Sequence, residues 1–190
     1  AYMTLCHNSD NEICDSAKGN NEHNGLSDFG REVVRRMNSA GMMVDLSHAS
    51  EKSFYDALEC SVKPIICSHS SSRVLCNHPR NLTDDQLRSL AAAGGVAQVC
   101  MYDGFLKKGG GATVVDAVRH LMHMIDIMGI EHVGIGTDFD GGGGVPGLSD
   151  ATWLVSFTGR LISEGLTPYE LTRIWGANFL SVWQRISAPD

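Results

Sequence analysis

The stretch MMVDLSHAS, Met42 to Ser50, decides the fold class of this chain. Its apolar run is short and nearly continuous and ends in Ser-His-Ala-Ser, and PIICSHSSS, Pro64 to Ser72, repeats the arrangement. Continuous apolar runs of this length are typical of parallel strands that are buried on both faces, whereas strands with one wet face alternate. The two stretches therefore predict two parallel strands, each followed by a histidine at its carboxyl end.

Runs of the same kind recur along the chain, and helical patterns separate them. The predicted strands lie at residues 2–5, 42–46, 64–67, 95–102 and 132–135. Helices are predicted to begin near residues 27, 50, 83, 113, 150 and 167, the last of them at a Thr-Pro start signal. Because strand and helix alternate repeatedly, the sequence predicts an α/β fold with a parallel sheet, in a single domain over residues 1–190.

The first predicted helix follows a long polar loop. The loop runs from Asn8 to Gly25, and long loops in compact domains are often functional. Ser27 is a suitable N-cap for the helix, and apolar residues then recur every three or four positions. The predicted apolar face comprises Leu26, Phe29, Val33, Met37 and Ala40.

Composition and charge exclude several classes of function. The chain has 190 residues, 43% of them hydrophobic, which fits one globular domain. A formal net charge of -7 without any basic cluster argues against nucleic acid as a partner. No apolar run approaches the ~18–20 residues of a membrane span. The six cysteines form no CxxC pair, so we expect mostly free thiols rather than a structural zinc site.

Polar side chains follow the predicted strands at the point where each strand ends. They are His7, His48, His69, Tyr102 and Asp138, in strand order. Because the carboxyl ends of parallel strands meet at one edge of the sheet, where such folds keep their active sites, these side chains are expected to converge.

The chemistry of this set suggests a metal-dependent hydrolase. His48 and His69 suit one ion of the Zn²⁺ type, Asp138 can move a proton, and the planar guanidinium group of Arg80 can pair with a substrate carboxylate. A single histidine at a strand end is more often structural, and Asp138 could instead cap a turn, a role expected rather of Asp140.

The pair His120 and His123 invites a second metal-site interpretation. Both share a predicted helix face with Asp116, Arg119 and Asp126, so we expect a solvated helix surface there instead.

Several stretches resemble those of a known family. They are GLSDFGREVVRRMNSAGMMVDLSHAS, PIICSHSSSRVLCNHPRNL, GIGTDFDGGGGVPGLSD and IWGANFLSVW, in this order along the chain. Together they resemble the membrane dipeptidases, also called renal-type dipeptidases, which are two-zinc enzymes of the amidohydrolase superfamily with a (β/α)8 TIM-type barrel. The resemblance implies zinc-dependent hydrolysis of dipeptides by a metal-activated hydroxide, in an enzyme that often forms a homodimer.

The resemblance also implies a role for each matching residue. His48 and His69 would bind one of the two zinc ions, and Asp138 would be the proton-shuttling acid and base. His7 would contact the substrate and help to stabilise the oxyanion, and Arg80 would hold the free carboxylate of the dipeptide.

The chain departs from the family pattern in its metal ligands. The family holds its first zinc with a His-x-Asp pair on the opening strand and bridges both metals with a glutamate, and neither feature is found in a strand here. A complete barrel takes roughly 250 residues. We therefore expect the chain to be the C-terminal portion, with about the last five strands, and the N-terminal part of the same barrel to be its partner.

Two alternatives to a dipeptidase remain at this point. One is a related amidohydrolase that acts on another amide or ester, and the other is a non-catalytic fragment that lacks the first metal site. The compartment is not encoded in these residues, although the resemblance implies a secreted, periplasmic or membrane-associated protein.

Overall fold

The computed structural model describes residues 1–187 and shows one parallel sheet of five strands. The strands are β1 (Tyr2–Thr4), β2 (Met43–Asp45), β3 (Ile66–Cys67), β4 (Val96–Val99) and β5 (Val133–Ile135). They lie side by side in the order β1-β2-β3-β4-β5, and all neighbouring pairs are parallel. The predicted α/β fold is therefore confirmed, with strands shorter than the apolar runs that predicted them.

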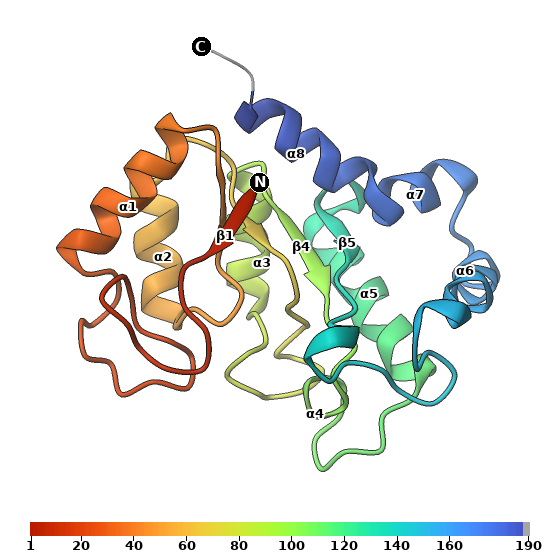
Figure 1. Cartoon of the computed structure of the whole chain (residues 1–190). Helices are drawn as coiled ribbons and strands as arrows, with labels where there is room; N and C mark the ends of the chain where they lie inside the picture. Colours follow the sequence, from red (N-terminus) through yellow and green to blue (C-terminus); the bar gives the residue numbers. More distant parts are fainter. Residues whose placement is uncertain (188–190) are drawn as a thin grey trace.

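Helices follow the strands, as the alternation predicted (Figure 1). They are α1 (Asp28–Ser39), α2 (Glu51–Cys60), α3 (Asp84–Ala92), α4 (Asp103–Leu106), α5 (Val114–Met128), α6 (Leu154–Ser163), α7 (Pro168–Thr172) and α8 (Asn178–Ser187). Ser27, Thr83 and Thr167 accept backbone N–H groups as N-caps, which explains where α1, α3 and α7 begin. In the part of the chain that the structure describes, no helix is both long and apolar enough to span a bilayer.

The buried face of α1 differs by one position from the prediction. The buried residues are Gly30, Val34, Met37 and Asn38, whereas Phe29 is 59% exposed. Gly30 lies on the buried face because its backbone is directly against Ile13. A Cβ at this position would come within 2.0 Å of the Ile13 carbonyl oxygen. The long loop before α1 therefore sets the orientation of the helix.

Helix α8 seals the amino-terminal end of the strands. Val182 and Ile186 pack against Met43, Ile66 and Val96, one residue from each of the three central strands. These five residues, here called the amino-end cluster, are each at most 2% exposed. In Figure 1, α8 lies across the upper end of the sheet, and the loops that follow the strands gather at the opposite end.

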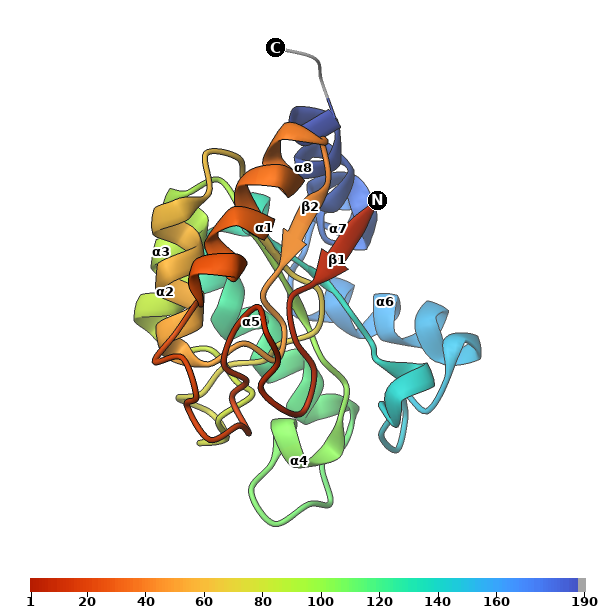
Figure 2. The ribbon, with the colours of Figure 1, turned by 60° about the vertical axis from the view of Figure 1, so that its left-hand side comes forward.

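Helices α1, α2 and α3 stack along one side of the sheet (Figure 2). The loop from residue 8 to residue 25 lies at the carboxyl end of β1 and β2, below these helices in both views. All six cysteines are free, and four of them are at most 3% exposed, which confirms the expected free thiols.

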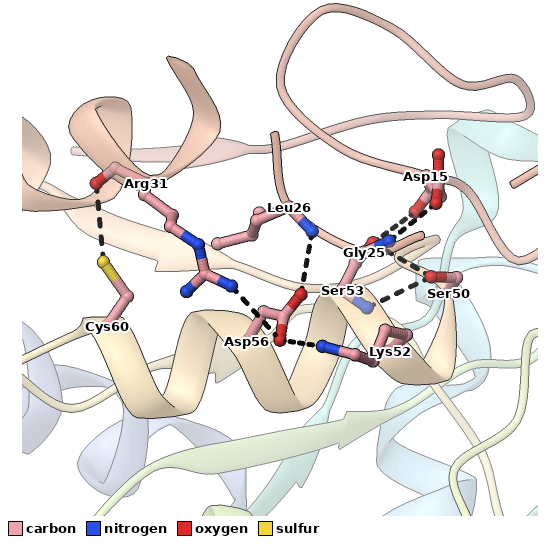
Figure 3. Close-up of polar contacts among 9 residues, drawn as sticks. All are labelled: Asp15, Gly25, Leu26, Arg31, Ser50, Lys52, Ser53, Asp56 and Cys60. Atoms are coloured by element: carbon pink, nitrogen blue, oxygen red, sulfur yellow. Dashed lines mark hydrogen bonds and ion pairs between the residues drawn. The ribbon is translucent and has the colours of Figure 1, made fainter. Parts of the chain in front are cut away.

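Two buried aspartates hold the long loop in place and connect it to α2 (Figure 3). Asp15 is fully buried and accepts the backbone N–H groups of His23 at 2.9 Å and Gly25 at 2.7 Å, while its carbonyl oxygen accepts Ser53 Oγ at 2.9 Å. Asp56 on α2 accepts the backbone N–H of Leu26 at 3.1 Å. The loop is thus held against the start of α2, next to the residues that follow β2.

Candidate metal and substrate site

Three histidines meet at the carboxyl end of the sheet. The Nε2 atoms of His48 and His69 lie 2.9 Å apart, and the ring centroids of His7 and His48 are 4.1 Å apart. His7 is exposed, and its carbonyl oxygen accepts Ser16 Oγ from the long loop at 2.6 Å. The structure thus brings together three side chains from the ends of three different strands, as expected from the parallel topology.

The backbone of His48 is unusual. Its φ of 74° lies in the left-handed region. This conformation costs a non-glycine residue free energy and persists only where the surrounding structure imposes it. The imposing contact comes from the long loop, since the His48 carbonyl oxygen accepts the N–H of Ala17 at 2.7 Å. The loop therefore fixes the direction in which this imidazole points.

Both converging histidines are held in the neutral state. His48 is 7% exposed, and burial together with nearby Arg80, His69 and His7 lowers its pKa to about 3. Burial and Arg80 also lower the pKa of His69. Neutral imidazole is the form that binds metal ions, so this pair is a suitable half of a metal site.

Ser68 connects the ring of His69 to Asp45 on the neighbouring strand β2. Ser68 Oγ lies 2.8 Å from His69 Nδ1 and 2.6 Å from Asp45 Oδ2. The backbone N–H of His69 donates to Ser47 Oγ at 2.9 Å. Asp45, at the end of β2, is fully buried.

Arg80 is a buried cation without an acidic partner. It is 3% exposed, and within residues 1–187 no carboxylate lies at ion-pair distance from it. Nη2 donates to the His69 carbonyl oxygen at 3.3 Å, Nε is buried without a partner, and the guanidinium lies 5.3 Å from the ring centroid of Phe105. Burial lowers the pKa of Arg80, yet an arginine stays charged in proteins.

Asp138 follows β5 in a strained conformation. Its φ of 65° is left-handed, and its carboxylate caps no backbone N–H of the short turn Phe139–Gly141. The thiol of Cys100 donates to Oδ2 at 3.6 Å. The capping alternative is therefore not what this structure shows, and the carboxylate is left available at the edge of a cleft.

A cleft of about 380 Å³ lies beside the sheet, next to the segments that follow β3 and β5. Its lining residues include Thr4, Ser68, His69, Gln98 and Asp138. In the part of the chain that the structure describes, no group of three or more His, Cys, Asp or Glu side chains is placed to hold a metal ion. The imidazoles of His48 and His69 converge beside this cleft, with their Nε2 atoms 2.9 Å apart.

The expectation of a solvated surface at His120 and His123 is wrong for His120 and holds only in part for His123, which is half-buried. His120 is 1% exposed: its Nδ1 accepts the Ser72 N–H at 3.1 Å, and its Nε2 lies 3.0 Å from the Leu106 carbonyl oxygen. His123 Nε2 lies 2.8 Å from Asp84 Oδ1 on α3. These histidines join α5 to its neighbours and are structural.

Comparison with known families agrees with the geometry of the strand ends. The model of the membrane dipeptidase family, peptidase family M19, matches residues 1–189. The chain belongs to this family. The resemblance found in the sequence motifs is therefore confirmed over essentially the whole chain.

Individual members of the dipeptidase family cover the chain but extend beyond it. The chain is 41% identical over 191 residues to an uncharacterised dipeptidase of Schizosaccharomyces pombe, and 37% identical over 188 residues to the dipeptidase tcpJ of Claviceps purpurea. These matches cover 97% of this chain in both cases, but only 46% and 44% of those proteins. The chain spans somewhat less than half the length of these curated relatives.

Solved dipeptidase structures share the fold. A metallo peptidase of Rhodobacter sphaeroides, liganded with a phosphinate mimic of L-Ala-D-Ala, is 31% identical with a TM-score of 0.83 over 90% of this chain and 49% of that one. The probable dipeptidase PvdM of Pseudomonas aeruginosa has a TM-score of 0.94 at 24% identity, over 97% of this chain and 62% of its own. The five strands described here therefore correspond to part of a larger amidohydrolase barrel.

Sequence reasoning overlooked Asp45 and Ser68, which the structure places against the candidate site. Asp45 stands three residues before His48 in VDLSH, and Ser68 stands directly before His69 in CSHSS, so their positions were visible. What the sequence did not display is that β2 and β3 pair in a register that sets Asp45 opposite Ile66, two residues before Ser68.

Proposed function

We propose that this chain is the C-terminal portion of a zinc-dependent dipeptidase. Residues 1–190 would form a single domain that is part of the dipeptidase barrel. The observation that carries the proposal is the convergence of two neutral imidazoles, with Nε2 atoms 2.9 Å apart, close to the buried Arg80, which has no acidic partner among the described residues. Membership of the dipeptidase family supports the same substrate class.

The two imidazoles fit a zinc ion. Burial lowers the pKa of both His48 and His69, which keeps them neutral, and their Nε2 atoms lie 2.9 Å apart. They would hold one of the two ions expected in the complete site. Zinc bound there would lower the pKa of a water molecule and polarise the peptide carbonyl group.

Arg80 would select dipeptides by their length. A buried cation without a counter-charge is costly, and a substrate carboxylate would relieve this cost while leaving the guanidinium in place. In a longer peptide the next residue would occupy that position. The Arg80 guanidinium lies over the Phe105 ring, 5.3 Å from its centroid, and this cation–π contact would help to hold it in place.

His7 and Asp138 would act on the reacting groups. His7 is exposed beside His48, where its ring N–H could donate to the oxyanion that develops on the carbonyl oxygen. Asp138 would accept the proton of the attacking water at a carboxylate oxygen and pass it to the departing amine. The Cys100 thiol, which donates to Oδ2, would help to keep this carboxylate in place.

The rest of the barrel would complete the metal site. Among the described residues, β1 and β5 each pair with only one strand, so each has a free edge for a further parallel strand. The N-terminal part of the same barrel would occupy these edges and supply the other metal ligands. The assembled enzyme would form the homodimer that the family resemblance implies.

The test is hydrolysis by the whole protein that carries these residues, with metal removed and restored. We expect cleavage of unblocked dipeptides to fall at least about a thousandfold after chelation, since a bound metal contributes several kcal/mol, and to return with Zn²⁺. N-blocked amides and lactones serve as comparison substrates. Preference for these would support the related amidohydrolase, and absence of any turnover in zinc-loaded protein would support the non-catalytic fragment.

A further inference from the structure

The buried carboxylate of Asp45 is saturated with hydrogen-bond donors. Oδ1 accepts the backbone N–H groups of Ser47 at 3.0 Å and Ser68 at 2.9 Å. Oδ2 accepts the hydroxyl groups of Thr4 at 2.7 Å and Ser68 at 2.6 Å. An ionised carboxylate only accepts hydrogen bonds, so in all four contacts the proton belongs to the partner of Asp45.

This arrangement determines where the protons of Ser68 and His69 lie. Ser68 has one hydroxyl proton, and the 2.6 Å contact with Asp45 takes it, because the carboxylate cannot donate. The Ser68 oxygen can then only accept in its 2.8 Å contact with His69 Nδ1. His69 must therefore carry its proton on Nδ1, which leaves the lone pair on Nε2.

The free lone pair of His69 faces the candidate metal position. Nε2 lies 2.9 Å from His48 Nε2, so a proton in that contact must belong to His48. His48 has no comparable support, because its Nδ1 is buried without a partner. The protein thus sets the tautomer of one histidine of the pair and leaves the other free to adapt.

We propose that Asp45 and Ser68 are positioning residues that lock His69 in its Nδ1–H tautomer and hold its ring, so that Nε2 is always ready to bind a cation. The part of this inference that concerns zinc rests on the proposed function, and the part that concerns the tautomer does not. Partners of this kind typically contribute 10–100-fold to metal affinity.

The first measurement is the tautomer of His69, from the ¹⁵N chemical shifts of its ring in the whole protein near neutral pH. We expect Nδ1–H in the unaltered protein and in Ser68→Thr, which keeps the hydroxyl. Ser68→Ala should give a mixture of tautomers. Ser70→Ala is the matched control, because Ser70 is also buried but its hydroxyl has no partner, and it should match the unaltered protein.

Asp45→Asn is the sharper variant, because it should invert the tautomer. The Asn oxygen must face the two backbone N–H groups, which can only donate, so its NH₂ must face the Thr4 and Ser68 hydroxyls. Ser68 would then be free to donate its proton to His69 Nδ1 at 2.8 Å, in preference to the Ser47 hydroxyl oxygen at 3.4 Å. We expect the His69 proton to move to Nε2 in this variant, an outcome that a merely space-filling role of Asp45 does not produce.

The second measurement is the zinc dissociation constant, from competition with a chromophoric chelator. Ser68→Ala and Asp45→Asn should weaken zinc binding about 10–100-fold, while Ser68→Thr and Ser70→Ala leave it unchanged. An Nε2–H tautomer in the unaltered protein, or equal zinc affinities for Ser68→Ala and Ser70→Ala, would overturn the proposal. If the tautomers behave as expected but no dipeptide is cleaved, the proposed function fails and this inference stands.

Discussion

The chain contains two pairs of buried or half-buried histidines, and they differ in what their ring nitrogens contact. On α5, His120 has a backbone partner at each ring nitrogen, and His123 pairs with Asp84. At the strand ends, His48 and His69 direct their Nε2 atoms at one another, and His48 Nδ1 has no partner at all. The first pair is bound to other segments of the chain, whereas in the second pair the two rings contact each other and one ring nitrogen is unpaired among the described residues.

The comparison shows that burial alone does not separate a structural histidine from a ligand. His120 is less exposed than His48, and burial lowers the pKa of both. The distinguishing observation is the state of hydrogen bonding, because native proteins rarely leave buried polar atoms unpaired without a reason. The unpaired Nε of Arg80 falls in the same category.

Removing one histidine from each pair should produce the largest expected effects, one on zinc affinity and the other on stability. His69→Ala removes a proposed ligand and should weaken zinc binding by at least about 100-fold, which is nearly 3 kcal/mol. His120→Ala leaves the Ser72 N–H and the Leu106 carbonyl group unpaired and should lower the free energy of unfolding by about 2–4 kcal/mol. Chelator competition and urea denaturation measure the two quantities. Loss of zinc binding in folded His120→Ala would contradict the division into a structural pair and a metal-binding pair.

The pH dependence of stability should isolate His120. Burial lowers its pKa from 6.5 to about 4, so between these values the unfolded chain binds more protons than the folded protein, and stability falls as the pH decreases. Protonation would also turn Nδ1, which accepts the Ser72 N–H, into a donor. Between pH 7.5 and pH 5 the protein should lose about 2 kcal/mol more than His120→Gln does, as measured by urea midpoints. Parallel pH profiles of the two proteins would contradict this account.

The smallest expected effect on stability concerns Arg80. Here the informative result is whether the free energy of unfolding rises or falls. Arg80→Met removes a buried charge without an acidic partner and should raise the free energy of unfolding by about 1 kcal/mol. It should also raise KM for dipeptides about 10–100-fold, since a charge-assisted pair is lost. Dipeptide amides, which lack the carboxylate, provide the control and should be cleaved equally by both proteins. An unchanged KM for free dipeptides would remove the carboxylate role.

The sequence predicted those features that depend on local pattern. Continuous apolar runs located all five strands, and their parallel arrangement brought His7, His48 and His69 together as expected. The fold class followed from the same alternation of strand and helix. The roles of the strand-end residues, by contrast, stay predictions until the experiments above are done.

What the sequence did not predict depends on contacts between distant segments. His120 was expected in solvent because its helix neighbours are polar, but the segments around Ser72 and Leu106 cover it. The face of α1 was misplaced because Gly30 packs on Ile13 of the long loop. The connection from Asp45 to His69 depends on the register between β2 and β3, which no single stretch displays.

The position of α8 also has a consequence for how the chain is made. The amino-end cluster joins Met43, Ile66 and Val96 to Val182 and Ile186, so its later members leave the ribosome more than about a hundred residues after Met43. At about 5–20 residues per second, the apolar end of the growing sheet waits on the order of 10 s for its cover. During that interval it presents the kind of apolar surface that chaperones bind, and a chain that ended before α8 would keep this surface uncovered.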